Sequence, residues 1–180
     1  MVFAVVANAW KVSTVNSNLK KKWNKKPKQI KMEEIQADIL NEKTGLIVHG
    51  VNCRAKMGAG IAQQIRKRYP QVYNDYMSYC KDHNQPQAML GTVVFTPITD
   101  KLVIASAFTQ LNYGTHGLRY VSYDAVDQCF NVINRYALEH QLIIKYPKIG
   151  VGLGGGHWGI VSTIIEANIS EEIRHILFVQ

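Results

Sequence analysis

Residues 46–69 read LIVHGVNCRAKMGAGIAQQIRKRY, and this stretch decides the fold. Its first six residues are mostly apolar, which predicts a strand that is covered on both faces. In its last nine residues, Ile61, Ile65 and Tyr69 recur at helical spacing, and Pro70 ends the predicted helix. Between strand and helix lie Asn52 and the glycine-containing run MGAG. The stretch therefore predicts a buried strand that turns through glycines into an amphipathic helix.

A glycine corner between a strand and a helix suits an anionic ligand. Small residues let backbone N–H groups approach the ligand, and the start of a helix carries partial positive charge. The same corner also serves tight packing of a helix against a strand, so this stretch alone leaves both interpretations open.

A second glycine-rich stretch, YPKIGVGLGGGHW, covers residues 146–158. Five glycines fall between Gly150 and Gly156. Glycine loses more conformational freedom on folding than any other residue, which favours a ligand loop over a loop that only packs. A helix over residues 158–168 follows the loop.

The remaining periodicity completes an α/β pattern. Further strands are predicted at 2–7, 30–35, 91–95, 102–108, 142–145 and 175–179, and further helices at 71–84 and around 126–137. Strands that alternate with helices predict one sheet with helices on both faces. We expect an extension over 1–29, with a strand and a Lys-rich part, followed by one domain over 30–180.

Composition is that of an ordinary globular protein. The chain has 180 residues, of which 47% are hydrophobic and 19% charged. No apolar run approaches the ~20 residues of a membrane span, so we expect no membrane contact. The cysteines Cys53, Cys80 and Cys129 have no metal-like spacing, which predicts free thiols, no metal site and a cytoplasmic location. Cys53 lies in the loop that contains Asn52, where it is either a nucleophile or a residue without a chemical role.

The formal net charge of +8 is concentrated in one segment. Residues 20–31, KKKWNKKPKQIK, contain seven lysines and no acid. Such a segment either makes weak contact with nucleic acid or is a solvated linker.

Three stretches together resemble the macro domain family of ADP-ribose-binding modules. They are HGVNCRAKMGAGIAQQIRKRYP at 49–70, in which Asn52 precedes Gly58 by six positions, IASAFTQ at 104–110, and PKIGVGL at 147–153. The resemblance extends over about residues 30–180 and is greatest to the ADP-ribose 1″-phosphate phosphatases. It implies a three-layer α/β/α domain with a central mixed sheet.

The resemblance also implies a ligand cleft at the strand ends that works without metal or cofactor. Asp38 would hold the adenine, although the local sequence favours a turn cap at Asp38. The glycine loops would hold the pyrophosphate, and Asn52 the distal ribose. The implied ligand-binding residues are Ala37, Asp38, Ile39, Gly50, Val51, Asn52, Met57, Gly58, Ala59, Gly60, Ile61, Ala62, Gly150, Val151, Gly152, Leu153, Gly154, Gly155 and Gly156.

Three activities fit the resemblance. A phosphoric monoester hydrolase would release phosphate from ADP-ribose 1″-phosphate, with Asn52 orienting the substrate and His49 or His157 as acid–base groups. His49 is equally a structural strand histidine, and His157 an ordinary exposed one. A glycohydrolase would remove ADP-ribose from protein or nucleic acid, but Gln110 and Gly154 stand where that branch has lysine and aspartate. A reader would bind ADP-ribose without turnover.

Overall fold

The computed structural model describes residues 32–114 and 117–180. A six-stranded sheet runs in the order β1-β6-β5-β2-β4-β3. Only β3 and β4 pair antiparallel; the other pairings are parallel, so the expected mixed sheet is confirmed. The strands are β1 (Glu33–Gln36), β2 (Gly45–Asn52), β3 (Val93–Pro97), β4 (Leu102–Gln110), β5 (Ile144–Pro147) and β6 (His175–Val179).

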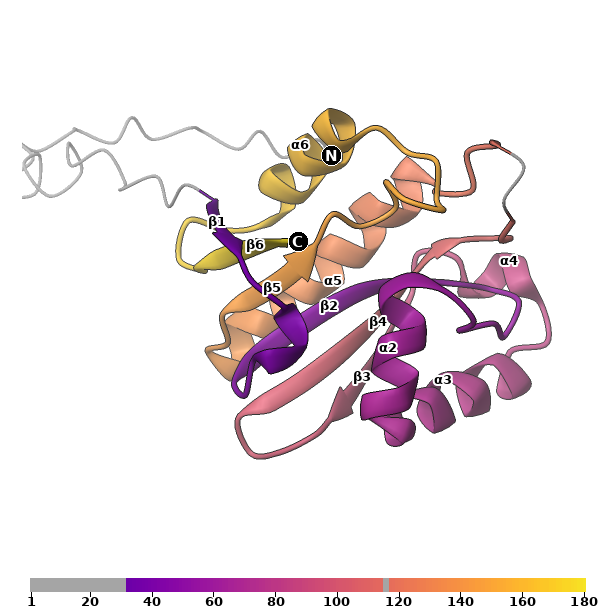
Figure 1. The fold of residues 1–180 in the computed structure, drawn as a ribbon, viewed down its shortest axis with the longest axis horizontal. Helices are drawn as coiled ribbons and strands as arrows, with labels where there is room; N and C mark the ends of the chain where they lie inside the picture. Colours follow the sequence, from indigo (N-terminus) through magenta and orange to yellow (C-terminus); the bar gives the residue numbers. More distant parts are fainter. Residues whose placement is uncertain (1–31, 115–116) are drawn as a thin grey trace, which may run out of the picture.

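Helices cover both faces of this sheet, as Figure 1 shows. On one face lie α5 (Tyr123–His140) and α6 (Trp158–Asn168), and on the other α2 (Gly60–Arg68) and α3 (Pro70–Asp82). Two short elements complete the chain: the 3₁₀ helix η1 (Ile39–Asn41) and α4 (Pro86–Met89). The expected three-layer α/β/α architecture is therefore confirmed. No helix in the described ranges is both long and apolar enough to cross a bilayer.

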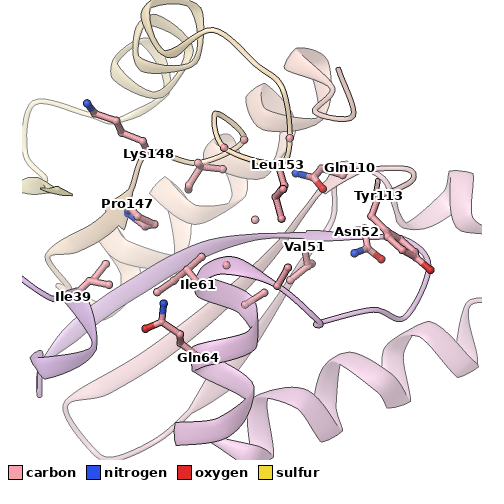
Figure 2. A pocket seen from close by; sticks show the side chains of 18 of the residues that line it. Ile39, Val51, Asn52, Ile61, Gln64, Gln110, Tyr113, Pro147, Lys148 and Leu153 are labelled. Carbon is pink, nitrogen blue, oxygen red and sulfur yellow. The ribbon is translucent and has the colours of Figure 1, made fainter. Parts of the chain in front are cut away.

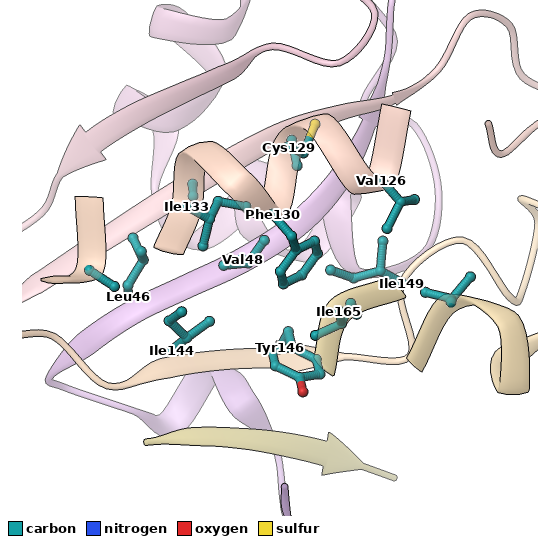
Figure 3. Close-up of a cluster of buried hydrophobic side chains, with 14 of the residues drawn as sticks. Leu46, Val48, Val126, Cys129, Phe130, Ile133, Ile144, Tyr146, Ile149 and Ile165 are labelled. Carbon is teal, nitrogen blue, oxygen red and sulfur yellow. The ribbon is translucent and has the colours of Figure 1, made fainter. Parts of the chain in front are cut away.

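Strand β2 is the centre of the fold because both of its faces are covered. Its side chains alternate between the two cores: Leu46 and Val48 pack toward α5 and α6, and Ile47 and Val51 toward α2 and α3. Figure 3 shows both Leu46 and Val48 in the core against α5 and α6, with Val48 beside Phe130 of α5. The apolar run of residues 46–51 is therefore a doubly buried strand, as predicted.

Two strands begin two residues later in the structure than the sequence pattern predicts. Strand β3 starts at Val93 because Gly91 and Thr92 form a turn, with Gly91 at φ +87° and Thr92 N donating to Met89 O at 3.0 Å. Strand β5 starts at Ile144 because the turn that caps the C-terminus of α5 includes Leu142, whose N donates to Ala137 O at 2.9 Å. The start of the 30–35 strand, the 2–7 strand, the Lys-rich segment 20–31 and the predicted boundary at residue 30 lie outside the described residues.

Candidate functional site

A cleft of about 660 Å³ lies where the parallel strands end (Figure 2). The carboxyl ends of β2, β4, β5 and β6 all contribute to its lining, as do the loops after β2 and β5. Open α/β sheets bind ligands at this edge because the loops there converge from neighbouring strands.

One end of the cleft is apolar. Ile39, Pro147 and Phe178 line it, and Gln64 of α2 adds an amide near Ile39. Figure 2 labels Ile39, Pro147 and Gln64 at this end of the cleft. Asp38 does not line the cleft: its carboxylate accepts from Leu40 N at 2.9 Å and caps η1. The local expectation of a turn cap at Asp38 is therefore confirmed, and its neighbours Ala37 and Ile39 face the cleft.

The start of α2 forms one wall of the middle of the cleft. The residue before the helix, Ala59, offers no side-chain cap, and Gly60, Ile61 and Ala62 of the first turn all line the cleft. The first N–H groups of a helix have no intrahelical partner, so this wall presents backbone donors and a positive dipole end. Met57 does not line the cleft: its side chain is buried in the core and anchors the loop.

The loop after β5 forms the opposite wall. Gly150, Gly152, Leu153 and Gly154 line the cleft, whereas Val151, Gly155 and Gly156 do not. The latter two glycines close the loop, since Gly155 N donates to Gly152 O at 3.0 Å and Gly156 N to Gly150 O at 2.8 Å. At Gly152 an added Cβ would meet nothing within 4 Å, so the wall there is open to a ligand.

Residues 118–121 of the same chain support this loop on the side away from the cleft. Gly154 O accepts hydrogen bonds from Tyr120 N at 2.9 Å and Val121 N at 3.0 Å. Gly150 has φ +72°, and a Cβ there would lie 2.6 Å from Val121 Cγ2. A Cβ at Gly155 would lie 2.6 Å from Leu118 O. Glycine is therefore required at 150 and 155 by conformation and by space.

The other end of the cleft is polar and is organised by Asn52, which is 7% exposed. Its Oδ1 accepts from Arg54 N at 3.0 Å, and its Nδ2 donates to Lys56 O at 2.7 Å. Gln110 and Tyr113 line this end with Lys56 (Figure 2 labels Asn52, Gln110 and Tyr113). The Asn52 amide thus holds the loop that follows β2 and also forms part of the cleft surface.

The charge of the lining is positive. Lys56 and Lys148 are its charged side chains, and no Asp, Glu or His side chain of the described residues lines it. Within the same residues there is no group of three His, Cys, Asp or Glu side chains that could hold a metal ion. Backbone donors, two lysines and an apolar end suit an anionic ligand with a flat, carbon-rich part.

The two histidines singled out as acid–base groups lie away from the cleft lining. His49 is fully buried, with Nε2 3.0 Å from Ser106 Oγ, and burial lowers its pKa to about 3. His157 is exposed at the start of α6, and its backbone N donates to Tyr123 Oη at 3.0 Å. Neither ring is therefore placed to contact a ligand in the cleft.

Cys53 is equally poorly suited to act as a nucleophile. It is buried, and burial raises the pKa of its thiol to about 11, so the thiolate is scarce at neutral pH.

The positions where the glycohydrolase branch has lysine and aspartate both line the cleft, as Gln110 and Gly154. A Cβ at Gly154 would lie 2.5 Å from Gly150 O and 2.7 Å from Gln110 Nε2. An aspartate at 154 therefore does not fit this loop conformation.

Several lining residues were missed in the sequence. Gln110, Pro147 and Val179 are the last residues of their strands. The rule that ligands bind at strand ends could have found them and the residues that follow them, Lys148, Ile149 and Gln180. The others come together only in the folded chain. The missed residues are Lys56, Gln64, Gln110, Tyr113, Gly114, Pro147, Lys148, Ile149, Phe178, Val179 and Gln180.

Several known proteins are similar to this chain in sequence or in architecture. The ADP-ribose 1″-phosphate phosphatase of Saccharomyces cerevisiae is 31% identical over 162 residues, covering 73% of this chain and 89% of that protein. A DNA ADP-ribosyl glycohydrolase of Mycobacterium tuberculosis is 28% identical over 122 residues, covering 67% of this chain and 34% of that protein. The structure of DarTG from Thermosipho africanus in complex with ADP-ribose has a TM-score of 0.68 at 17% identity, covering 91% of this chain and 50% of that chain.

The family follows from a sequence profile. The Macro domain profile matches residues 48–165, which is more than half of the chain and includes both glycine-rich loops. Together with the relatives and the mixed sheet, this match confirms the resemblance seen in the sequence. The chain belongs to the macro domain family.

Proposed function

We propose that this protein binds ADP-ribose in the cleft and hydrolyses ADP-ribose 1″-phosphate to ADP-ribose and phosphate. The order of surfaces along the cleft carries the proposal: an apolar end, a middle walled by backbone donors, and a polar end with a lysine. These surfaces match adenine, pyrophosphate and distal ribose in the order in which ADP-ribose presents them. The name of the Saccharomyces cerevisiae relative supports the phosphatase reaction.

The adenine would lie against Ile39 and Phe178, with the Gln64 amide able to donate to or accept from its edge. The pyrophosphate would lie between the start of α2 and the Gly150–Gly154 wall, where fixed amides supply the positive field. The distal ribose would then reach Asn52.

Hydrolysis breaks the bond between phosphorus and the ribose 1″ oxygen. A water oxygen bonds to phosphorus, its proton is lost to phosphate or solvent, and the ribose oxygen gains a proton. Because no Asp, Glu or His side chain of the described residues lines the cleft, the lining residues would contribute orientation and charge stabilisation. Asn52 has the central role, because it shapes the loop and borders the ribose site.

The decisive experiment incubates the protein with ADP-ribose 1″-phosphate and a chelator and measures released phosphate, with ADP-ribose binding followed by calorimetry. Gly152→Val points a side chain into open cleft space and should lower affinity at least tenfold without lowering the melting temperature. Asn52→Ala should abolish release. Ala167→Val, on the exposed side of α6, is the matched control that should change neither. Absence of ADP-ribose binding by the unaltered protein would overturn the proposal.

A second candidate is removal of ADP-ribose from protein or nucleic acid, favoured by the similarity to the Mycobacterium tuberculosis glycohydrolase. Gln110 and Gly154 argue against that branch's lysine and aspartate mechanism. Release of ADP-ribose from ADP-ribosylated DNA, with no phosphate released from the 1″-phosphate, would favour this candidate. Saturable ADP-ribose binding with neither product would indicate a reader.

Two further parts of the proposal concern the cellular location of the protein and its contact with nucleic acid. The free thiols of Cys53, Cys80 and Cys129 support a cytoplasmic location, where thiols stay reduced. Weak nucleic-acid contact through residues 20–31 is supported by their seven lysines alone. Its test is an affinity that falls steeply with salt and survives Asn52→Ala.

A further inference from the structure

We propose that Lys56 binds the terminal phosphate of ADP-ribose 1″-phosphate and that Tyr76 is the residue that positions it. The inference rests on the proposed function and names the side chain that distinguishes the phosphorylated substrate from its product. It starts from the location of Lys56, which lines the cleft beside Asn52 at the polar end.

The backbone of Lys56 is fixed from two sides. Lys56 O accepts from Asn52 Nδ2 at 2.7 Å, and Lys56 N donates to Tyr76 Oη at 3.0 Å. The preceding residue, Ala55, has φ +55°, a conformation that is uncommon for a side chain other than glycine. The loop thus accepts local strain to place Lys56 at the cleft.

Tyr76 is the anchor of this arrangement. It lies on α3, is fully buried and stacks on Phe108 with ring centroids 5.5 Å apart. Its hydroxyl donates to Asn52 O at 2.7 Å while it accepts from Lys56 N. Burial raises the pKa of Tyr76, so the hydroxyl keeps its proton and stays a donor. One hydroxyl therefore ties the end of β2 to residue 56.

The side chain of Lys56 is free to meet an anion. No carboxylate of residues 32–114 or 117–180 lies within 4.0 Å of its ammonium. The lining also contains no acidic side chain that would compete for it. An ammonium near the distal ribose is placed to pair with a phosphate on that ribose, whereas ADP-ribose itself offers only a hydroxyl there.

Lys148 provides the matched control. It is the other lysine of the lining, but it follows Pro147, which Figure 2 places with Ile39 toward the apolar end. Neutralising Lys148 should affect ADP-ribose and its 1″-phosphate by the same factor, because both share the adenosine part.

The experiment compares the affinities for ADP-ribose and for ADP-ribose 1″-phosphate by calorimetry, at a temperature where every variant is folded. Hydrolysis is avoided by short injections at low temperature. Lys56→Gln should weaken binding of the 1″-phosphate about tenfold and of ADP-ribose less than about twofold, and Lys56→Arg should restore most of the loss. Tyr76→Phe, which keeps the ring and removes the hydroxyl, should reduce the ratio of the two affinities about threefold.

The outcomes separate the inference from the proposed function. If the unaltered protein binds both ligands and Lys56→Gln changes both affinities alike, Lys56 does not bind the terminal phosphate, although the cleft still binds ADP-ribose. If Tyr76→Phe leaves the ratio unchanged, Tyr76 is not a positioning residue. If the unaltered protein binds neither ligand, the proposed function fails and the inference fails with it.

Discussion

Acidification should destabilise this protein through His49. The ring is fully buried and its pKa is lowered to about 3 by burial, against 6.5 for a free histidine. Below pH 6.5 His49 binds a proton in the unfolded chain but stays neutral in the folded chain, so stability falls as pH falls toward 3. Between pH 7 and pH 5 the linkage relation gives a loss of about 2 kcal/mol from this one residue.

The assay is urea unfolding at pH 7 and pH 5, followed by circular dichroism. His49→Gln is the informative variant, because its amide can reach Ser106 Oγ but does not titrate. His175 also has a lowered pKa, through burial, and adds loss in the same direction in both proteins. The variant should therefore lose about 2 kcal/mol less than the unaltered protein between the two pH values. Equal losses in the two proteins would refute the reasoning.

Three other outcomes are expected. Gly154→Ala should cost about 1–3 kcal/mol of stability in thermal unfolding because its Cβ would lie 2.5 Å from Gly150 O, whereas Gly58→Ala, with open space around it, should cost less than about 1 kcal/mol. Lys145→Met should lower the free energy of unfolding by about 2 kcal/mol, because it leaves the carboxylate of Glu42 without its buried partner. Urea unfolding checks this, and an unchanged midpoint would contradict it. Cys129 should resist iodoacetamide at pH 8 until the protein is unfolded, because burial raises its thiol pKa to about 12; mass spectrometry of the native protein checks this.

Much of the fold could be predicted because local pattern and tertiary burial agree. The helix over Trp158–Asn168 and the strand over His175–Val179 have the boundaries expected from their apolar spacing. The starts of β3 and β5 were displaced because Thr92 N donates to Met89 O and Leu142 N to Ala137 O, which holds these residues in turns. Those carbonyls belong to preceding helices, and hydrophobic periodicity carries no signal of them.

The site was predictable as two loops but not residue by residue. Glycine-rich composition located both walls, yet Met57 and Gly156 turn away from the cleft while Gly58 and Gly152 face it. Side-chain direction in an irregular loop depends on hydrogen bonds within the loop, which no spacing rule gives. Gln64 was missed for another reason: it is a polar residue of an amphipathic helix, and only the tertiary fold places the cleft beside it.

The support behind the Gly150–Gly154 wall has a practical consequence for protein engineering. Because Gly154 O accepts from both Tyr120 N and Val121 N, and Gly150 packs on Val121, the loop is one half of a two-part unit. A transplant of residues 147–157 into another scaffold would leave its backbone acceptors without donors. A functional graft of this anion-binding wall would have to carry residues 118–121 with it, although they lie some thirty residues earlier in the chain.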